Sequence, residues 1–505
     1  MKKTILLLFC NELTLKKNIQ ITLLFCVFAI LIFILTDSFH VIAYGPKGVH
    51  CWRQADCASY ALNYYQNELP FFKPQVHNLT GYNGYTVSEF PLFYFITAKM
   101  YNVFGRHEYF LRGLNFLVFI TGCSCLLWLC LGIIKTKWIA SIPAILTLTS
   151  PYLYYYGLNF LPDVPSLSLS LIAWYFIYQF FVKHKLRWLY ATAIFFCLAC
   201  LIKISAGISF AALVAAITFS ARLRTEKYFR KNHLLHFYFL AVLVVLVNLA
   251  WIIFAKNYNN AYGNHLNLMG VLPVWDISAH KIGTVFARIG FKWMPVILQP
   301  FIWIWLLTSI AVVRKKIVAV DPMISGITKW LFIGTFCYSL LWFQAFEHHD
   351  YYIINPFIAI IAMLILVCIA FDNAEEKHRK VFCLSTIAII PFSIFQLCSE
   401  MSSRYNDSKY VYFNPAFTTI ELYLRSIGIS RYDKVLSIPD PSPNITLYYL
   451  NQPGYTICYL DSLSQHGIKY VVVNNENNLL DTSLSKRLGS LKGEYQGIKI
   501  FTIIE

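Results

Sequence analysis

The sequence has little charge. Asp, Glu, Lys and Arg make up 13% of its 505 residues, whereas soluble domains carry roughly 25%. Hydrophobic residues make up 58% of the chain and gather in long runs. The composition excludes a soluble globular protein and predicts a polytopic membrane protein.

The first apolar run, residues 19–36, lacks the small-x-small site at which a secretory signal is cleaved. It contains no charged residue and is long enough to span a bilayer. Lys16 and Lys17 precede it, and basic flanks of this kind stay in the cytoplasm. We therefore predict an uncleaved first helix, a cytoplasmic N-terminus and an outer face reached near residue 37.

The basic excess does not form one continuous patch. The formal net charge is +17, yet ten basic and ten acidic residues leave segment 399–505 neutral. The short segments near 157–163 and 347–351 hold no Lys or Arg. This alternation marks cytoplasmic loops, so it argues against a surface that binds nucleic acid. The basic loops are 135–137, 183–187, 222–231, 314–316 and 377–380.

Apolar runs and basic loops together predict a mainly α, polytopic transmembrane bundle of about eleven spans. The segment 188–220 can be one kinked helix containing Lys203 or two helices, and two helices keep the alternation of basic loops intact. An odd number of spans places the C-terminal segment outside. The predicted spans are 19–36, 110–134, 138–156, 164–182, 188–202, 205–220, 236–255, 294–313, 329–346, 352–371 and 381–398.

Cysteine gives few signals. The chain has 14 cysteines, but no CxxC pair recurs with the spacing of a zinc site. Most of them lie in apolar spans, where they act as small hydrophobic residues. Cys51 and Cys57 flank Asp56 on the predicted outer face. The sequence leaves open whether they pair, and two free thiols are the simpler interpretation.

The chain divides into a multi-span membrane domain, residues 1–398, and an extracytoplasmic tail, residues 399–505. The membrane domain includes a large first outer loop, residues 37–109, in which we predict one helix over 56–66 and an amphipathic helix over 90–104. We predict a small α/β fold for the tail, which covers the outer face or docks a partner. Its predicted elements are a helix at 417–427 and strands at 434–438, 470–473 and 498–503.

Four polar clusters fall on the outer face of this topology, which follows from Lys and Arg alone. Membrane packing does not explain such clusters. Because all four fall on the same side of the membrane, they predict a site there. The clusters are Trp52-Arg53-Gln54-Ala55-Asp56, Ser88-Glu89-Phe90-Pro91-Leu92, Asn159-Phe160-Leu161-Pro162-Asp163-Val164-Pro165 and Glu347-His348-His349-Asp350-Tyr351-Tyr352.

Each cluster also has a purely structural interpretation. Asp56 and Asp163 can cap the helices that follow them. Glu89 can be a solvated loop charge, Arg53 can lie among lipid head groups, and Lys203 can extend along the membrane towards its surface. The segment 348–350 can be a polar hinge. It is a weak metal motif, because adjacent His residues on one helix point apart.

At these residues the chain resembles the polyprenyl-phosphate-dependent glycosyltransferases of the GT-C fold, in glycosyltransferase family 39. That family includes protein O-mannosyltransferases and lipid A aminoarabinose transferases. The resemblance covers most of the chain, including the tail, and depends on the order and spacing of motifs rather than on any single one. The motifs are Trp52-Arg53-Gln54-Ala55-Asp56, Glu89-Phe90-Pro91-Leu92, Leu161-Pro162-Asp163, Leu201-Ile202-Lys203 and His349-Asp350-Tyr351-Tyr352.

The resemblance implies two catalytic acids. Asp56 matches the acidic residue of the family's first outer loop, and Asp163 matches a second acid between the third and fourth spans. Some relatives place a Lys where Glu89-Phe90 stands here, so several cations are candidates to hold the donor phosphate: Arg53, Lys99, Arg106, Arg112 and Lys203. The other residues expected to bind substrate are Trp52, Gln54, Glu89, His349, Asp350 and Tyr351.

The implied reaction is sugar transfer from a polyprenyl-phosphate-sugar donor to a lipid, glycan or protein acceptor on the outer face of a membrane, expected to be a bacterial inner membrane. Asp56 would be the base that deprotonates the acceptor. A cation would neutralise the leaving phosphate. Some enzymes of this fold use a divalent metal, and the sequence leaves that requirement open; no other cofactor is expected.

Three alternatives remain beside this interpretation. A transporter or flippase of lipid-linked sugars would place ionisable groups near mid-membrane, whereas this chain places them in outer loops. A polymerase or ligase of surface saccharides would carry long outer loops late in the chain. A structural scaffold would not need four polar clusters on one face.

Overall fold

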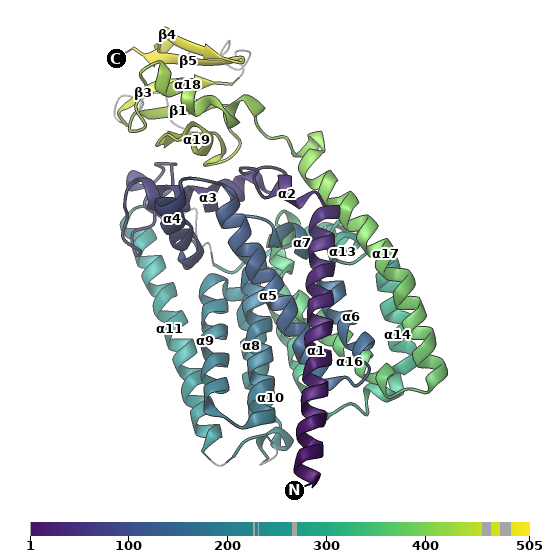
Figure 1. Cartoon of the computed structure of the whole chain (residues 1–505). Coiled ribbons are helices and arrows are strands. Elements are labelled where there is room, and N and C mark those ends of the chain that lie inside the picture. Colours follow the sequence, from purple (N-terminus) through teal and green to yellow (C-terminus); the bar gives the residue numbers. More distant parts are fainter. Residues whose placement is uncertain are drawn as a thin grey trace.

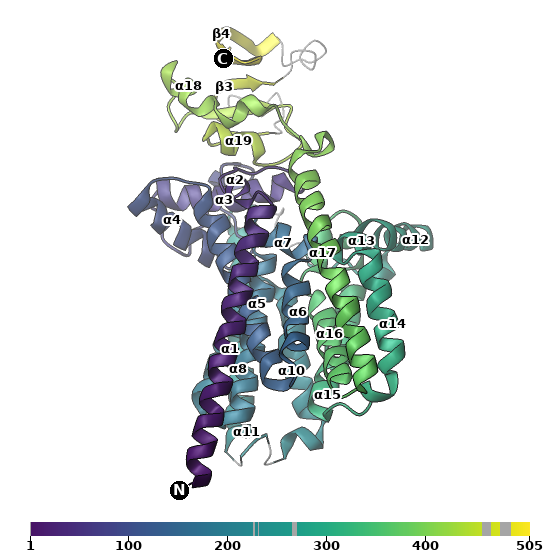
Figure 2. The same ribbon diagram turned by 45° about the vertical axis from the view of Figure 1, so that its right-hand side comes forward.

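The computed structural model describes residues 2–225, 228–230, 232–264, 270–456, 466–474 and 486–504. Within these residues, eleven helices form a bundle with its N-terminus at one end and the tail at the other (Figures 1 and 2). They are α1 (Lys2–Leu35), α5 (Tyr109–Ile133), α6 (Lys137–Leu148), α8 (Asp163–Lys183), α9 (Leu186–Ile202), α10 (Gly207–Phe219), α11 (His233–Ala261), α14 (Pro300–Ile317), α15 (Pro322–Leu341), α16 (Phe357–Asp372) and α17 (Glu376–Asn406).

These helices follow the order of the predicted spans. Six helices among the described residues are long and apolar enough to cross a membrane, and the number is seven if the pair Ala279–Ile297 and Pro300–Ile317, bent by 88°, forms one broken span. The helices α6, α9, α10 and α16 are apolar but shorter. The chain is therefore an integral, multi-pass membrane protein, and the number of eleven spans stays a prediction.

The helix α8 lies at the centre of the bundle. Its apolar stretch is 78% buried, whereas that of the peripheral helix α1 is 17% buried. It packs most extensively against α5 and α9. The first residue of α8 is Asp163, so a carboxylate stands at one end of the most enclosed of the six helices that are long enough to cross a membrane.

The stretch 188–220 forms two helices, as predicted. Helix α9 ends at Ile202, and a 3-10 turn, η2 (Ile204–Ala206), leads into α10. Lys203 lies in this break with extended backbone. The predicted third span is also broken, because the short helix α7 (Pro151–Gly157) follows α6 after Ser150, which caps α7 by accepting a hydrogen bond from Leu153 N.

The segment predicted as the first outer loop forms helices that lie across the end of the bundle nearest the tail (Figure 1). They are α2 (Ser38–Val41), α3 (Cys51–Gln66), η1 (Tyr82–Gly84) and α4 (Leu92–Phe104). Helix α3 begins five residues before the predicted start, so the Asp56 motif lies on the helix and not ahead of it. A later outer segment contains η4 (Val274–Asp276), α12 (Ala279–Arg288), η5 (Ile289–Trp293), α13 (Met294–Ile297), η6 (Phe343–Glu347) and η7 (Asp350–Ile353).

The tail is a small α/β domain. Its five-stranded sheet has the order β2-β1-β3-β5-β4, with β1 parallel to β2 and β3, and β5 antiparallel to β3 and β4. The described elements are η8 (Ser408–Tyr410), η9 (Pro415–Thr418), α18 (Ile420–Ser426), β1 (Lys434–Ile438), α19 (Ile445–Leu450), β2 (Gly454–Tyr455), β3 (Ile468–Val473), β4 (Leu488–Tyr495) and β5 (Ile498–Ile503).

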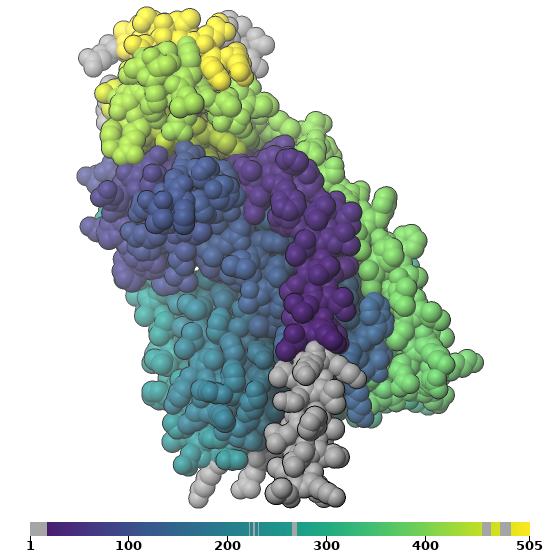
Figure 3. Space-filling model, viewed as in Figure 1, coloured from purple at the N-terminus to yellow at the C-terminus, as the bar shows by residue number. Residues whose placement is uncertain are grey.

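The tail rests on top of the first outer loop, which stays visible below it in Figure 3. Helix α19 packs against α3, and Asn78 pairs in parallel with Gly454 of β2. Helix α17 runs past residue 399 to Asn406 before the tail begins to fold on its own. The outer loop and the tail are therefore joined by backbone as well as side-chain contacts.

Candidate active site

A tight loop ahead of α3 sets the position of the first polar cluster. Gly48 has φ +82°, and a Cβ there would lie 2.3 Å from the carbonyl oxygen of Arg404 in α17. The next residue, Val49, donates its N–H to that same oxygen at 3.3 Å. Gln54 donates to the carbonyl oxygens of Lys47 at 2.7 Å and Val49 at 3.0 Å. The Gln54 amide is thus occupied in holding this loop and is not free to bind substrate.

Asp56 lies in the second turn of α3, with its side chain 15% exposed. Asn444 of the tail donates to Asp56 Oδ1 at 2.7 Å, and Arg53 Nη1 lies 3.6 Å from Oδ2. Burial raises the pKa of Asp56 to about 6, although Arg53 and Asn444 both act to lower it. The helix already begins at Cys51, so the interpretation of Asp56 as a helix cap is wrong.

Arg53 pairs with Glu89 across the gap between α3 and the start of α4. Its Nη2 lies 2.7 Å from Glu89 Oε1 and 2.6 Å from Oε2. The hydroxyls of Ser88 and Tyr94 also donate to Glu89. Burial disfavours the charge of Glu89, but Arg53 and then Lys203 hold its pKa below the usual value. Glu89 is a buried, paired carboxylate rather than a solvated loop charge.

Asp163 and Lys203 form a second ion pair. Lys203 Nζ lies 3.0 Å from Asp163 Oδ1, and the Asp163 side chain is 1% exposed. Within the described residues the Asp163 side chain makes no capping hydrogen bond to α8, so the cap interpretation fails here too. The Lys203 ammonium lies 5.3 Å from the Tyr351 ring centroid and 5.5 Å from that of Tyr352. Lys203 therefore points into the site and not towards the membrane surface.

Asp350 is the third buried carboxylate of the cluster. It accepts hydrogen bonds from His50 Nε2 at 2.9 Å and Tyr156 OH at 2.5 Å, and Arg404 Nη2 lies 3.5 Å from it. Burial alone would raise the pKa of Asp350, but the hydrogen bond and charge of His50, with Arg404, lower it to about 2. Asp350 is thus held ionised.

The two adjacent histidines of the fourth cluster point apart. The His348 side chain is 64% exposed and lies beside Glu347, which pairs with Lys281 of α12. His349 lies 5.6 Å from the Trp52 ring and 5.5 Å from the Tyr351 ring, between centroids. Burial, followed by His50 and His348, lowers the pKa of His349 to about 4, so this imidazole is neutral at neutral pH.

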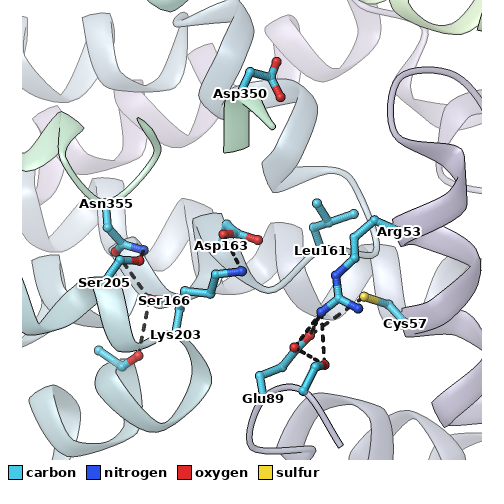
Figure 4. Close-up of polar contacts among 12 residues, drawn as sticks. Arg53, Cys57, Glu89, Leu161, Asp163, Ser166, Lys203, Ser205, Asp350 and Asn355 are labelled. Carbon is cyan, nitrogen blue, oxygen red and sulfur yellow. Dashed lines mark hydrogen bonds and ion pairs between the residues drawn. The ribbon is translucent and has the colours of Figure 1, made fainter. Parts of the chain in front are cut away.

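The four clusters meet at the end of α8 that lies nearest the tail. Figure 4 shows Asp163 and Lys203 pointing towards each other, the Arg53–Glu89 pair on one side and Asp350 on another. Arg53 and Glu89 both lie close enough to act electrostatically on Asp163 and Lys203. The arrangement is one buried group of acids and bases drawn from α3, α8, the α9–α10 break and η7.

The structure narrows the choice of cations. Lys99 is exposed. Arg106 pairs with Glu108 and Glu421, and the buried Arg112 donates to the carbonyl oxygens of Tyr44, Leu158 and Gly45. Lys99 and Arg106 do not face the cluster, and Arg112 contacts it through Gln54 Oε1, to which its Nη2 donates at 3.2 Å. Arg53 and Lys203 remain.

Sequence reasoning missed three residues of this cluster. His50 and Arg404 hold Asp350, and Asn444 holds Asp56. The only sequence signal for Arg404 is a charged residue in the last turn of a long apolar helix. Two of its guanidinium nitrogens, Nε and Nη1, are buried without a hydrogen-bond partner among the described residues.

The residues do not fit a divalent metal. Each carboxylate lies beside a cation: Asp56 and Glu89 beside Arg53, Asp163 beside Lys203, and Asp350 beside Arg404. In the described part of the chain no three His, Cys, Asp or Glu side chains are grouped as a metal site would require. Cys51 and Cys57 are buried free thiols in the described structure.

An apolar pocket with a cavity volume of about 90 Å³ lies deeper in the bundle, between α5, α8, α15 and α16. On α8 it is lined by Leu171, Trp174, Ile177, Tyr178 and Phe181. Leu171 follows Asp163 by eight positions, which is about 12 Å along a helix. The bundle therefore contains an apolar space below the charged cluster.

Comparison with known proteins gives one family and a common fold. Residues 88–251 match the family model of dolichyl-phosphate-mannose-protein mannosyltransferases, a segment that contains Glu89, Asp163 and Lys203. Curated proteins give no match to this sequence.

Solved structures match over most of the chain. ArnT from Cupriavidus metallidurans bound to undecaprenyl phosphate is 11% identical, with 95% of this chain and 98% of that chain covered and a TM-score of 0.65. The apo state of the same protein is 12% identical, with 95% and 97% covered and a TM-score of 0.65. The apo oligosaccharyltransferase of Archaeoglobus fulgidus is 10% identical, with 90% and 69% covered and a TM-score of 0.57.

The resemblance found in the sequence is therefore confirmed: this is a membrane protein of the GT-C fold whose residues 88–251 carry the pattern of a glycosyltransferase family.

Proposed function

We propose that this chain transfers a sugar from a polyprenyl-phosphate donor to an acceptor on the outer face of the membrane, with Asp56 as the general base. One observation carries the proposal. Asp56 lies on α3 in contact with the tail, beside the charged cluster, and its pKa is raised to about 6. A base is most effective when its pKa is close to the working pH, and perturbed acids of this kind gather at functional sites.

In the proposed reaction, an acceptor oxygen forms a bond to the anomeric carbon while the bond from that carbon to the phosphate oxygen breaks. The electron pair of the broken bond stays on the polyprenyl phosphate. Asp56 takes the acceptor proton. Lys203 and Arg53 are placed to stabilise the negative charge that builds on the leaving phosphate.

Asp163 has a supporting part in this proposal. Its carboxylate lies 3.0 Å from Lys203 Nζ, so it sets the direction of the ammonium rather than taking a proton itself. Glu89 has the corresponding relation to Arg53, because both of its oxygens accept from Arg53 Nη2. We propose that Trp52, His349, Asp350 and Tyr351 line the space for the sugar.

The donor lipid is proposed from two observations. The apolar pocket begins about 12 Å along α8 from Asp163, which suits an isoprenoid tail whose phosphate lies at the charged cluster. The ArnT structure of the same fold has undecaprenyl phosphate bound. We also propose that the N-terminus is cytoplasmic and the tail extracytoplasmic, which their positions at opposite ends of the bundle support (Figures 1 and 2).

A transporter or flippase and a polymerase or ligase of lipid-linked saccharides are the other functions to consider. The charged cluster lies at helix ends under the tail, where a transport site near mid-membrane would not lie. No described feature favours either alternative over the proposed transfer.

The test is turnover of purified protein with a panel of radiolabelled undecaprenyl-phosphate sugars. Asp56→Asn should lower turnover about 10²–10⁴-fold while undecaprenyl phosphate still binds, and Asp56→Glu should recover part of the loss. The matched control is Asp37→Asn, because Asp37 is an outer-face aspartate with an exposed side chain that pairs with His40. Normal turnover in Asp56→Asn would remove Asp56 from the mechanism.

A further inference from the structure

The tail presents a rigid turn to the membrane domain. Asp440 accepts hydrogen bonds at 2.8 Å from Ser442 N, Ser442 Oγ and Thr446 N, and one at 2.5 Å from Thr446 Oγ1. Ser442 Oγ in turn accepts from Ile445 N at 2.9 Å. A buried carboxylate that accepts four hydrogen bonds fixes the backbone around it. Asn444 lies at the tip of this turn.

The Asn444 amide has its two ends committed to different partners. Asn78 N donates to Asn444 Oδ1 at 2.8 Å, and a backbone N–H can act only as a donor. The oxygen end must therefore face Asn78, which leaves Nδ2 to donate to Asp56 Oδ1 at 2.7 Å. The orientation of the amide follows from its partners rather than from an arbitrary choice between O and N.

The partner segment in the first outer loop is also fixed. Asn78 Nδ2 donates to the carbonyl oxygen of Pro443 at 2.7 Å. Leu79 N donates to Gly454 O at 2.8 Å, and Gly454 N donates to His77 O at 3.0 Å. Only glycine fits at position 454, because a Cβ there would lie 2.0 Å from the Val435 carbonyl oxygen. Both sides of the Asn444 contact are thus held in register.

From this geometry we propose that Asn444 is a positioning residue that orients the Asp56 carboxylate for its part as base, so that the tail completes the active site. The inference rests on the proposed function. Asn444 occupies Oδ1 from one side, so Oδ2, with Arg53 Nη1 at 3.6 Å, is the oxygen left to receive the acceptor proton. The turn around Asp440 supplies the rigidity that such an orientation needs.

The hydrogen bond also has a definite electrostatic sign. A donor favours the ionised form of Asp56, so its loss raises a pKa that is already about 6. The charged groups that act on Asp56 are Arg53, which opposes this rise, and Glu89, which adds to it. The Cys57 thiol and the Tyr60 phenol are the other titratable groups beside it. Asn444 is therefore one of two described groups that keep Asp56 ionised near neutral pH.

The sharpest variant is Asn444→Asp. A carboxylate oxygen can still accept from Asn78 N, so the contact that holds the turn survives. The donor to Asp56 is lost, and a like charge takes its place. The acid limb of the pH profile of kcat/KM should move to higher pH, and on that limb turnover should fall about tenfold for each unit by which the pKa of Asp56 rises. Activity should return at high pH.

Two further variants serve as a control and as a separate test of the lost donor. Asn414→Asp is the matched control, because Asn414 is also a tail asparagine that accepts a backbone N–H, from Ala416 at 3.0 Å, and Asp caps as well as Asn. It should leave the profile unchanged. Asn444→Ala removes the donor without adding a charge. The acid limb of its pH profile should therefore also move to higher pH, but by less than in Asn444→Asp. An equal or larger shift in Asn444→Ala would contradict the proposal.

The outcomes separate the two proposals. If Asp56→Asn is inactive while Asn444→Asp keeps the wild-type profile, the positioning role is wrong and Asp56 remains the base. If Asp56→Asn is fully active, the proposed function fails. Lower turnover in Asn444→Asp with an unmoved acid limb would also overturn the inference, because a merely structural contact behaves in that way.

A second measurement needs no sugar donor. The melting temperature of Asn444→Asp is compared with wild type at pH 8, and the same comparison is made in the Asp56→Asn background. The like-charge penalty should disappear when Asp56 carries no charge, as in a double-mutant cycle. An equal loss of stability in both backgrounds would show that Asn444 has no electrostatic coupling to Asp56.

Discussion

Lys203 and Asp163 form a buried ion pair, 3.0 Å between Nζ and Oδ1, that joins the α9–α10 break to the first residue of α8. Asp163 lies in the first turn of α8 without capping it, and Lys203 interrupts an apolar stretch. Burying two charges is costly unless each neutralises the other. We therefore propose that the pair serves the site it faces.

The first prediction concerns this pair. Asp163→Asn leaves the Lys203 charge buried without its partner, and breaking a buried pair typically costs about 3–5 kcal/mol. Lys203→Met should restore much of that stability in the double variant, although turnover should stay low in all three. The measurement is melting temperature together with turnover.

A surface pair provides the comparison. Lys469 lies 2.7 Å from Asp433 with its side chain 64% exposed, and such pairs contribute about 0–1 kcal/mol. Lys469→Met should therefore leave both readouts nearly unchanged. Wild-type stability and turnover in Asp163→Asn would mean that the charge of Asp163 contributes to neither.

The second prediction concerns stability against pH. The pKa of Asp56 is about 6 in the folded protein and about 4 in an unfolded chain, so the folded state binds more protons between these values. Stability should fall as pH rises from about 4 to about 6, by an amount on the order of 3 kcal/mol, and should stay lower above that range. Asp56→Asn should consequently melt at a higher temperature than wild type at pH 8, but not at pH 4. A lower melting temperature at pH 8 would count against the raised pKa.

The third prediction distinguishes arginine from lysine at position 53. The Arg53 guanidinium donates to both carboxylate oxygens of Glu89 through Nη2, and its Nη1 lies 3.6 Å from Asp56 Oδ2. A lysine keeps the charge but offers a single nitrogen, so it cannot hold both carboxylates in place. Arg53→Lys should lower turnover by at least about tenfold. Arg106→Lys changes an arginine that pairs with Glu108 and Glu421 outside the cluster, and turnover should not change.

The fourth prediction uses two glycines with the same backbone conformation. Gly48 and Gly105 both have φ +82°. A Cβ at Gly48 would lie within 4 Å of neighbouring atoms, whereas a Cβ at Gly105 would have no described atom within that distance. Both alanine variants bear the strain of a positive φ, of order 1–3 kcal/mol. Gly48→Ala should in addition displace the loop that carries His50 and should lower turnover. Equal turnover in the two variants would show that this loop does not position the site.

The fifth prediction tests the proposed topology. Reporter fusions after Lys316 should report a cytoplasmic position, and fusions after Glu505 an outer one, because the basic loops alternate along the chain. A cytoplasmic C-terminus would put the tail, and with it Asn444, on the wrong side for the proposed reaction.

The elements marked by long apolar runs or β-branched runs in the sequence were predictable. Apolar runs gave the order of the bundle helices, and β-branched runs gave the strands 434–438 and 498–503 with the bounds of β1 and β5. The two-residue strand β2 and the six-residue helix α19 were missed, because elements this short do not complete a period. Strand β4 was missed because Leu488–Tyr495 contains two glycines and charged residues in place of an apolar alternation.

The site was predictable where a polar residue stood out against its neighbours. Asp56, Glu89, Asp163 and Asp350 interrupt apolar or turn segments, so each drew attention. Asn444 did not, because an asparagine beside Pro443 has an ordinary explanation as a turn residue. Its partner lies 388 positions earlier in the chain, and no local pattern carries information about a contact at that separation.

The same separation has a consequence for biosynthesis. A growing chain makes Asp56, Arg53 and Glu89 early, together with the first outer loop, and makes Asn444 only after the last helix of the bundle has been inserted. Domains fold in the order in which they emerge, so in the proposed mechanism the base is made long before the amide that orients it. If that mechanism holds, arrival of the tail is the event that turns an inserted bundle into a working enzyme.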